Sequence, residues 1–359
     1  MPGPTDRDLV LVTGPGRSGT SALTGMLSML GVHVPGPLVG ANSTNERGFY
    51  ETRWVVDFQR KLLERAYTYE FDGDPRAELR VAKVLADGEA AGKLDAWFAP
   101  AAGQHSLVAV KDPRSIWFHD LWTTTAGKHG YQVKYLTTLR HPAEVVGSRT
   151  TYYSTETREL QAREYAVAKV AGWVHVSLLN ERETREQPRS FVLYDDLISA
   201  WRPVAAKIET ELGLAFPARP DPWDARHPVD DFISPQLHRV TTTWDDLDCP
   251  ESLQVIADEV WEACLRIAVH GRDADAEAAF DELSERYSRL YRDSAAIVAD
   301  MASSRVDRAR AKTARKVRAE LAAQRPPSTL TRLTEPLPAP VRRRVRRVGR
   351  RVIDRLVRR

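Results

Sequence analysis

The chain has 359 residues, of which 42% are hydrophobic and 28% are charged, and its formal net charge at pH 7 is +3. This composition is typical of a soluble globular protein, and so small a net charge excludes the binding of polyanions by bulk charge alone. Cys249 and Cys264 form neither a CxxC pair nor a cluster with histidine, so we expect no metal site. No run reaches the roughly 18 apolar residues of a membrane-spanning helix. The N-terminus lacks the pattern of a signal peptide, and we therefore expect a cytoplasmic protein.

The chain begins with a short apolar strand that leads through a glycine-rich turn into a helix. Residues 9–12 are apolar without alternation, which predicts a buried parallel strand, and residues 22–30 have the apolar spacing of a helix. The turn at residues 14–21 (GPGRSGTS) would present backbone N–H groups at a helix N-terminus, where an anion is favoured. We predict a phosphate-binding loop, with a strand–helix turn that binds no ligand as the alternative.

The loop differs from the usual P-loop at one position. Gly14 and Gly19 fit the GxxxxGK(S/T) spacing, but Thr20 stands in place of the lysine. The cation here is Arg17, inside the loop, and the hydroxyls of Thr20 and Ser21 can donate hydrogen bonds. This set suits a phosphate-like group and gives no positive sign of a metal–triphosphate site.

A second strand ends in a group of charged residues. Residues 54–66 have helical spacing, and residues 76–98 more weakly predict a further helix or two. The apolar run 107–110 predicts the next buried strand. Lys111, Asp112 and Arg114 follow it directly, at the end of the strand where open α/β sheets bind ligands. An ordinary helix start accounts for Asp112 before a proline, but less well for Lys111 and Arg114. A helix is expected over residues 115–129.

Further strands and helices complete the predicted sheet. Residues 132–139 form a third strand that runs into Arg140, and Ser148 lies about two turns into the helix that Pro142 opens. That loop and helix can direct one arginine and one hydroxyl toward a single anion. A long helix over 158–186, a strand over 189–194 and a helix over 200–212 follow. The alternation predicts a doubly wound parallel sheet flanked by helices.

The C-terminal part of the chain is loop-rich at first and then helical. Residues 213–250 contain many prolines, residues 251–270 and 275–323 have helical patterns, and a Pro-rich stretch leads to residues 341–359. This last segment has ten arginines and an apolar stripe, which predicts a basic amphipathic helix. It could contact the inner face of an anionic membrane, bind a polyanion or nucleic acid, or be a solvated helix that packs on its own protein or on a twin.

These patterns define the expected domains. They are a P-loop-type α/β domain (1–272), a long helical extension (273–323), a Pro-rich linker (324–340) and the basic helix (341–359). The extension could mediate a homodimer.

Several of these motifs, in this order, resemble the PAPS-dependent sulfotransferases, where PAPS is 3′-phosphoadenosine 5′-phosphosulfate. Residues 16–21 are similar to the 5′-phosphosulfate loop of that family, and residues 139–142 with Ser148 are similar to its 3′-phosphate motif. Residues 111–114 resemble the Lys-x-Pro element of carbohydrate sulfotransferases. Residues 45–51 and 192–197 resemble elements of bacterial members. The matched motifs lie within about residues 8–215. They are most similar to those of the bacterial and carbohydrate branches of the family.

The resemblance implies a role for each matched residue. The 5′-phosphate and the sulfuryl group would be held by Gly16, Arg17, Ser18, Gly19, Thr20 and Ser21, and the 3′-phosphate by Arg140 and Ser148. Lys111, with Arg17, would stabilise the transferring group, and Arg114 with Asp112 would contact the substrate. The general base would be Glu51 or, as the alternative, Glu46. The reserve candidates for the base are His33, His119 and His141.

The expected reaction is in-line transfer of the sulfuryl group from PAPS to a hydroxyl or amine of an acceptor, leaving 3′,5′-ADP. The expected acceptor is a glycan, a glycolipid or a small molecule; no metal is expected, and nucleic acid is not an expected partner. Two alternatives remain open: a small-molecule kinase of the P-loop type, and a non-catalytic protein that binds a nucleotide or a polyanion.

Overall fold

The computed structural model describes residues 7–43, 45–153, 159–237, 241–324, 338–341 and 343–345. The chain divides into two compact units, residues 1–292 and 293–359. Within the described ranges, no helix combines the length and the apolar character that crossing a membrane requires.

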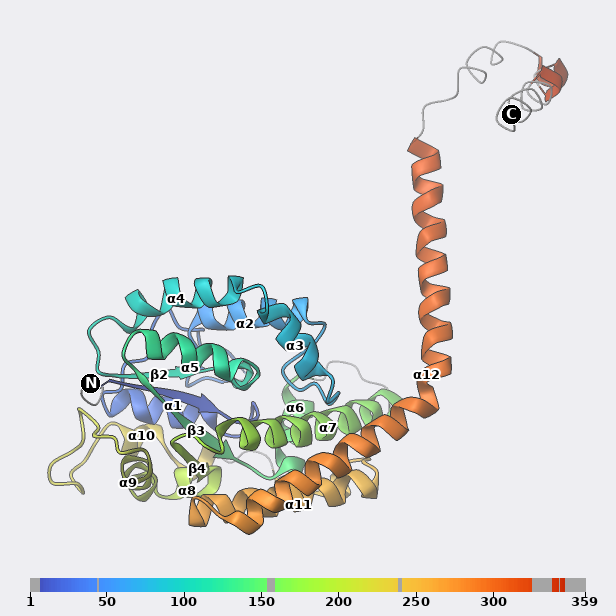
Figure 1. The fold of residues 1–359 in the computed structure, drawn as a ribbon. Coiled ribbons are helices and arrows are strands. Elements are labelled where there is room, and N and C mark those ends of the chain that lie inside the picture. Colours follow the sequence, from blue (N-terminus) through green and yellow to red (C-terminus); the bar gives the residue numbers. More distant parts are fainter. Residues whose placement is uncertain are drawn as a thin grey trace. The chain divides into compact units, whose positions relative to one another are not determined.

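A sheet of four parallel strands, counted over the described residues, forms the centre of the first unit (Figure 1). Its strands are β1 (Asp8–Thr13), β2 (Leu107–Lys111), β3 (Gln132–Leu139) and β4 (Arg189–Leu193), in the order β2-β1-β3-β4. Asp8 pairs with Leu107 on one side and with Gln132 on the other, so the carboxyl ends of the strands lie at the same edge. The predicted parallel sheet is confirmed.

Helices surround this sheet. They are α1 (Thr20–Met29), α2 (Arg53–Arg65), α3 (Ala77–Leu85), α4 (Glu89–Ala102), α5 (His119–Lys128), α6 (Pro142–Tyr153), α7 (Glu159–Thr184), α8 (Tyr194–Ser199), α9 (Trp201–Leu212), α10 (Val229–Phe232) and α11 (Glu251–His270). Short 3-10 helices cover Pro113–Phe118, Pro235–Leu237 and Trp244–Asp246. A further helix, α12 (Ala274–Gln324), runs from the first unit into the second.

Alternation along β1 divides these helices between the two faces of the sheet. Leu9 and Leu11 pack in a cluster with α2, α4 and α5, whereas Val10 and Val12 pack with α1 and α9. All four side chains are fully buried, because successive residues of a strand point to opposite faces and both faces are covered. Figure 1 shows α2, α4 and α5 on one side of the strands and α9 and α10 on the other. The sheet is therefore doubly wound, as predicted.

The first turns of α12 belong to the compact unit. Phe280, Leu283 and Tyr287 are buried in a cluster with α6, α7 and α11, and the Tyr287 hydroxyl donates to the Gly73 carbonyl at 2.6 Å. The compact unit therefore continues past residue 272, the limit expected from the sequence. The spacing of these apolar residues places them on one helix face, which explains why they pack there.

One predicted helix differs in the structure, and an open expectation is resolved. The expected helix over 115–129 is a 3-10 helix followed by α5, because Asp112 Oδ1 accepts a hydrogen bond from the Arg114 N–H at 2.9 Å and caps a tight first turn. The weak pattern over 76–98, which predicts one helix or two, forms two, α3 and α4, which are separated near Gly88, where φ is +73°.

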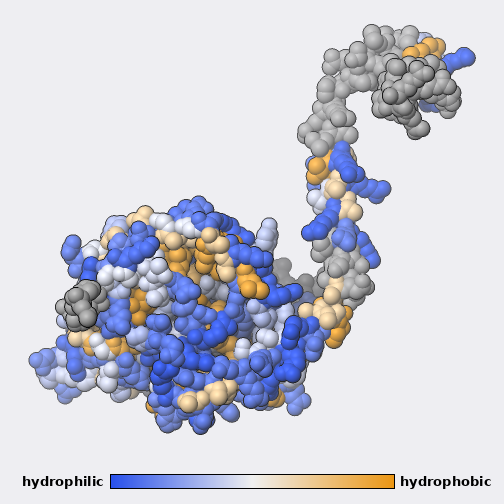
Figure 2. Space-filling view, viewed as in Figure 1, coloured by the Kyte–Doolittle hydropathy of each residue, from blue (hydrophilic) through white to orange (hydrophobic). Residues whose placement is uncertain are grey.

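In the second unit, the described side chains are those of a solvated helix. Residues 307–320 are all exposed, as are Ile297 and Val298, and hydrophilic and apolar side chains alternate along this part of α12 (Figure 2). The basic helix predicted over 341–359 lies outside the described residues except for positions 341 and 343–345, which are helical and exposed.

Candidate active site

The loop between β1 and α1 has the backbone of an anion-binding turn. Gly14 and Gly19 adopt φ angles of +104° and +98°, a region that glycine enters without steric cost. The Ser18 N–H and hydroxyl both donate to the Pro15 carbonyl, at 3.1 Å and 2.6 Å, and close the turn. Gly19, the N-cap of α1, has no side chain that could cap the helix. The N-terminus of α1 therefore offers amide donors and a positive dipole end.

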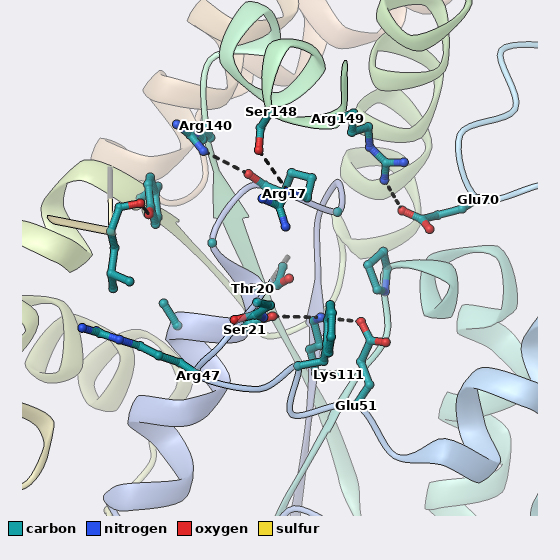
Figure 3. Close-up of a pocket in the computed structure, with 18 of the residues that line it drawn as sticks. Arg17, Thr20, Ser21, Arg47, Glu51, Glu70, Lys111, Arg140, Ser148 and Arg149 are labelled. Carbon is teal, nitrogen blue, oxygen red and sulfur yellow. Dashed lines mark hydrogen bonds and ion pairs between the residues drawn. The ribbon is translucent and has the colours of Figure 1, made fainter. Parts of the chain in front are cut away.

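A pocket of about 500 Å³ lies over this loop (Figure 3). The predicted residues that line it are Gly16, Arg17, Gly19, Thr20, Ser21, Glu46, Glu51, Lys111, Arg114, Arg140 and Ser148. Ser18 and Asp112 do not line it: both are fully buried, Ser18 inside the turn and Asp112 behind Arg114. Residues from four separate parts of the sequence meet here because β1, β2 and β3 end at the same edge of the sheet.

On one side of the pocket, two arginines and a serine form a connected group. Arg17 Nε donates to Ser148 Oγ at 3.0 Å, and Arg140 Nη1 lies 3.4 Å from the Arg17 carbonyl oxygen. The Arg140 guanidinium also pairs with Glu144 at 2.7 Å and stacks 4.9 Å from the centre of the Tyr194 ring. Arg140 and Ser148, which the sequence predicts to face one anion, both line this pocket, and each contacts Arg17. These guanidinium and hydroxyl donors suit a phosphate oxygen.

In the middle of the pocket, Lys111 and Glu51 form a close ion pair. Lys111 Nζ lies 2.5 Å from Glu51 Oε1 and 3.4 Å from Ser21 Oγ. The Lys111 side chain is only 3% exposed and that of Glu51 is 14% exposed, so the pair is largely removed from water. Glu46 also lines the pocket but is exposed at its rim. Of the two glutamates, Glu51 is thus the one held against the loop and the strand end.

A second group of charges forms the opposite wall. Arg114 Nη1 donates to Asp112 Oδ1 at 2.7 Å, and its Nη2 lies 3.8 Å from Glu70 Oε2. The other oxygen of Glu70 pairs with Arg149. Burial raises the pKa of Asp112 to about 7; Glu51 and Glu70 nearby add to the shift, and Arg114 opposes it. Burial alone would also raise the pKa of Glu70, but the charges of Arg149 and Arg114 outweigh it and lower that pKa.

Several residues of this pocket were not predicted as site residues. They include Arg47, Glu70, Arg149, Tyr165, Lys169, Tyr194 and Leu237. Arg149 follows Ser148 directly, and Arg47 and Tyr194 lie inside motifs already noted. Glu70 and Lys169 carry no local signal, since one lies in a loop after α2 and the other within α7.

The reserve histidines lie elsewhere. His33 faces the Ala101 carbonyl, His119 pairs with Glu183 at 3.0 Å, and His141 lies 3.5 Å from Asp258. The described lining of the pocket includes none of them.

The pocket carries an excess of positive charge. Among the residues that the structure describes, seven cationic side chains line it (Arg17, Arg47, Lys111, Arg114, Arg140, Arg149 and Lys169) against three carboxylates (Glu46, Glu51 and Glu70). In the same described residues, no cluster of three or more His, Cys, Asp or Glu side chains could hold a metal ion. The fold and this site define an α/β protein with a positively charged pocket at the carboxyl edge of its parallel sheet.

No family model matches this chain, and no curated protein matches it in sequence. Solved structures similar to it include the sulfotransferase domain of the olefin synthase from Synechococcus PCC 7002, at 20% identity and a TM-score of 0.40, covering 71% of this chain and 93% of that one. Another is sulfotransferase STF1 from Mycobacterium tuberculosis H37Rv, at 15% identity and a TM-score of 0.39, covering 71% and 76%. A third is the sulfotransferase domain from the curacin biosynthetic pathway, at 15% identity and a TM-score of 0.31, covering 61% and 79%.

Proposed function

We propose that this chain is a PAPS-dependent sulfotransferase that transfers a sulfuryl group to a hydroxyl or amine of a glycan or glycolipid. One observation carries the proposal. The loop before α1, the Arg17–Ser148–Arg140 group and the Lys111–Glu51 pair come from distant parts of the sequence and line one pocket. Each has the chemistry that one part of such a reaction needs.

The donor residues fit the two phosphate positions of PAPS. The loop of residues 16–21 would hold the 5′-phosphosulfate with backbone amides, with the hydroxyls of Thr20 and Ser21 and with the guanidinium of Arg17. Arg140 and Ser148 would hold the 3′-phosphate, the group that distinguishes this donor from ATP. Guanidinium, hydroxyl and amide donors are the ligands that phosphate and sulfate oxygens prefer.

The Lys111–Glu51 pair supplies the groups that a transfer to a hydroxyl requires. When bound, PAPS supplies an activated sulfuryl group on a phosphate leaving group. Glu51 would accept the proton of the acceptor hydroxyl, as a general base. Lys111, next to Glu51 and to Ser21 at the start of α1, would offset negative charge that develops between loop and acceptor. Glu46 is the alternative base, at the exposed rim of the same pocket.

The proposal is tested by calorimetric titration of the full chain with 3′,5′-ADP, with ADP and with ATP–Mg²⁺. We expect 3′,5′-ADP to bind most tightly of the three nucleotides. Arg140→Ala and Ser148→Ala should each lower the affinity for 3′,5′-ADP at least tenfold and change the affinity for ADP less. Lys93→Ala, at an exposed position of α4, is the matched control and should change neither affinity. Binding of ATP–Mg²⁺ with none of 3′,5′-ADP would overturn the proposal in favour of a kinase.

A further inference from the structure

We propose that the wall formed by Arg114, Arg149 and Lys169 binds an anionic group of the acceptor. The acceptor would then be a polyol that carries a carboxylate or phosphate close to the hydroxyl that is sulfated. This inference rests on the proposed function, because it assigns the remaining half of the same pocket.

The wall lies across the loop from the residues that would hold the 3′-phosphate. A Cβ on Gly16 would lie 2.7 Å from Arg149 Nη2 and 2.7 Å from Glu70 Oε1, so this ion pair rests on the first half of the loop. A Cβ on Gly19 would lie 2.2 Å from the Tyr194 ring, on which Arg140 stacks. In Figure 3, Arg140 and Glu70 accordingly lie on opposite sides of Arg17, and Lys111 and Glu51 lie beside Thr20 and Ser21.

The carboxylates of the wall do not balance its cations. Glu70 is shared between Arg149 and Arg114. The other partner of Arg114 is Asp112, whose burial favours the neutral acid. Two arginines and a lysine therefore face two carboxyl groups, Glu70 and Asp112, so the wall keeps an excess positive charge that a ligand could neutralise.

Lys169 is the clearest sign of a missing anion. Its ammonium lies 4.9 Å from the centre of the Tyr69 ring and 5.3 Å from that of Tyr165, and no carboxylate of the described residues lies within ion-pair distance of it. Burial, and then the charge of Arg149, lower the pKa of Lys169, and the more distant charges of Glu70 and Asp72 only partly oppose this shift. A half-buried cation that is held beside an arginine without a carboxylate partner is costly unless an anion binds to it.

The position of this wall favours the acceptor over the donor. The phosphates of PAPS are accounted for by the loop, Arg140 and Ser148, on the far side of Arg17. Glu51 and Lys111 are close enough to the wall for their charges to act on Arg114 and Glu70. An anion held by Lys169 and Arg149 would thus fix a neighbouring hydroxyl near Glu51, and Tyr165, which lines the same pocket, offers an aromatic surface for the ring of a sugar.

The test uses the full chain saturated with 3′,5′-ADP and titrated with glucuronate, glucose 6-phosphate and glucose. We expect one or both anionic probes to bind at least tenfold more tightly than glucose, and the better of the two identifies a carboxylate or a phosphate as the preferred group. Lys169→Met keeps the alkyl chain on the two tyrosines and removes the charge. This variant should lower the affinity for the anionic probes at least fivefold and leave the affinity for 3′,5′-ADP within twofold of that of the unchanged chain. Lys93→Met, at the exposed position on α4, is the control and should change neither.

The failures are distinguishable. If 3′,5′-ADP does not bind, the proposed function fails and the inference falls with it. If 3′,5′-ADP binds but neither anionic probe binds better than glucose, the inference is overturned and the proposed function stands. If Lys169→Met lowers the affinity for 3′,5′-ADP tenfold, the wall belongs to the donor site, and the inference is overturned as well.

Discussion

The Lys111 ammonium and the Glu51 carboxylate lie 2.5 Å apart between the end of β2 and the start of α1. Lys111 is the last residue of β2, and Glu51 lies two positions before the first residue of α2, so the end of a strand and the start of a helix position the pair. Because the pair is nearly buried, each charge depends on the other, and an acceptor hydroxyl that approaches Glu51 also approaches Lys111. This arrangement makes Glu51 the first residue to test.

Glu51→Gln should lower sulfuryl transfer by about 100- to 10,000-fold, the usual contribution of a general base, while 3′,5′-ADP still binds. The amide keeps a hydrogen-bond acceptor for Lys111 but takes no proton. Transfer of ³⁵S from labelled PAPS to a glycan acceptor measures the rate, and calorimetry measures nucleotide affinity. Glu64→Gln, on the exposed face of α2, is the control. A larger loss in Glu46→Gln than in Glu51→Gln would move the base to Glu46.

Two glycines of the loop should differ in their tolerance of a side chain. Gly19→Ala would force a Cβ to 2.2 Å from the Tyr194 ring at a φ of +98°. We therefore expect this variant to lower the free energy of unfolding by at least about 1–3 kcal/mol and to lower the affinity for 3′,5′-ADP. Gly16→Ala meets only the flexible ends of Arg149 and Glu70, and its cost should be smaller. Denaturant unfolding and calorimetry measure both effects.

Gly127→Ala is the control for these two variants. It lies in α5 with nothing within 4 Å of the added methyl, so it should be neutral or stabilise the protein by up to about 1 kcal/mol. If Gly16→Ala and Gly19→Ala lowered the free energy of unfolding equally, this result would contradict the expected clash between the Tyr194 ring and the methyl group of Gly19→Ala.

The sequence predicts the sheet and part of the site for one physical reason. Short apolar runs mark β1, β2 and β3, and parallel strands bring their carboxyl ends to one edge, so Lys111, Arg140 and the loop could be expected to meet. Glu70 and Lys169 could not be expected, because a loop and a long helix place them only through tertiary packing. The sequence does not assign the early turns of α12 to the compact unit, because their apolar spacing is the same whether a helix packs on its own domain or on a partner.

The hydrogen-bonded threonines beneath the loop should contribute to stability. Thr13 Oγ1 lies 2.9 Å from Thr137 Oγ1, which also accepts a hydrogen bond from Asn180 Nδ2 at 3.0 Å, and all three residues are buried. Thr137→Val keeps the shape and leaves both partners unsatisfied, so we expect it to lower the free energy of unfolding by about 1–3 kcal/mol. Urea unfolding measures the change. Thr210→Val, exposed on α9, should stay within about 0.5 kcal/mol; an equally small change at Thr137 would show that the chain of hydrogen bonds contributes little.

The buried carboxyl of Asp112 should make stability depend on pH. Its pKa is raised from its ordinary value of 3.8 to about 7, first by burial, so between these values the folded chain holds a proton that the unfolded chain releases. The free energy of unfolding therefore falls as pH rises from 4 to 7, by at most about 1.4 kcal/mol per pH unit from this group. Asp112→Asn removes the titration, so its stability relative to the natural chain should increase across this window. Urea unfolding at pH 4, 5.5 and 7 measures the difference, with the exposed Asp57→Asn as the control. A difference that stays constant with pH would mean that Asp112 titrates alike in the folded and unfolded chain.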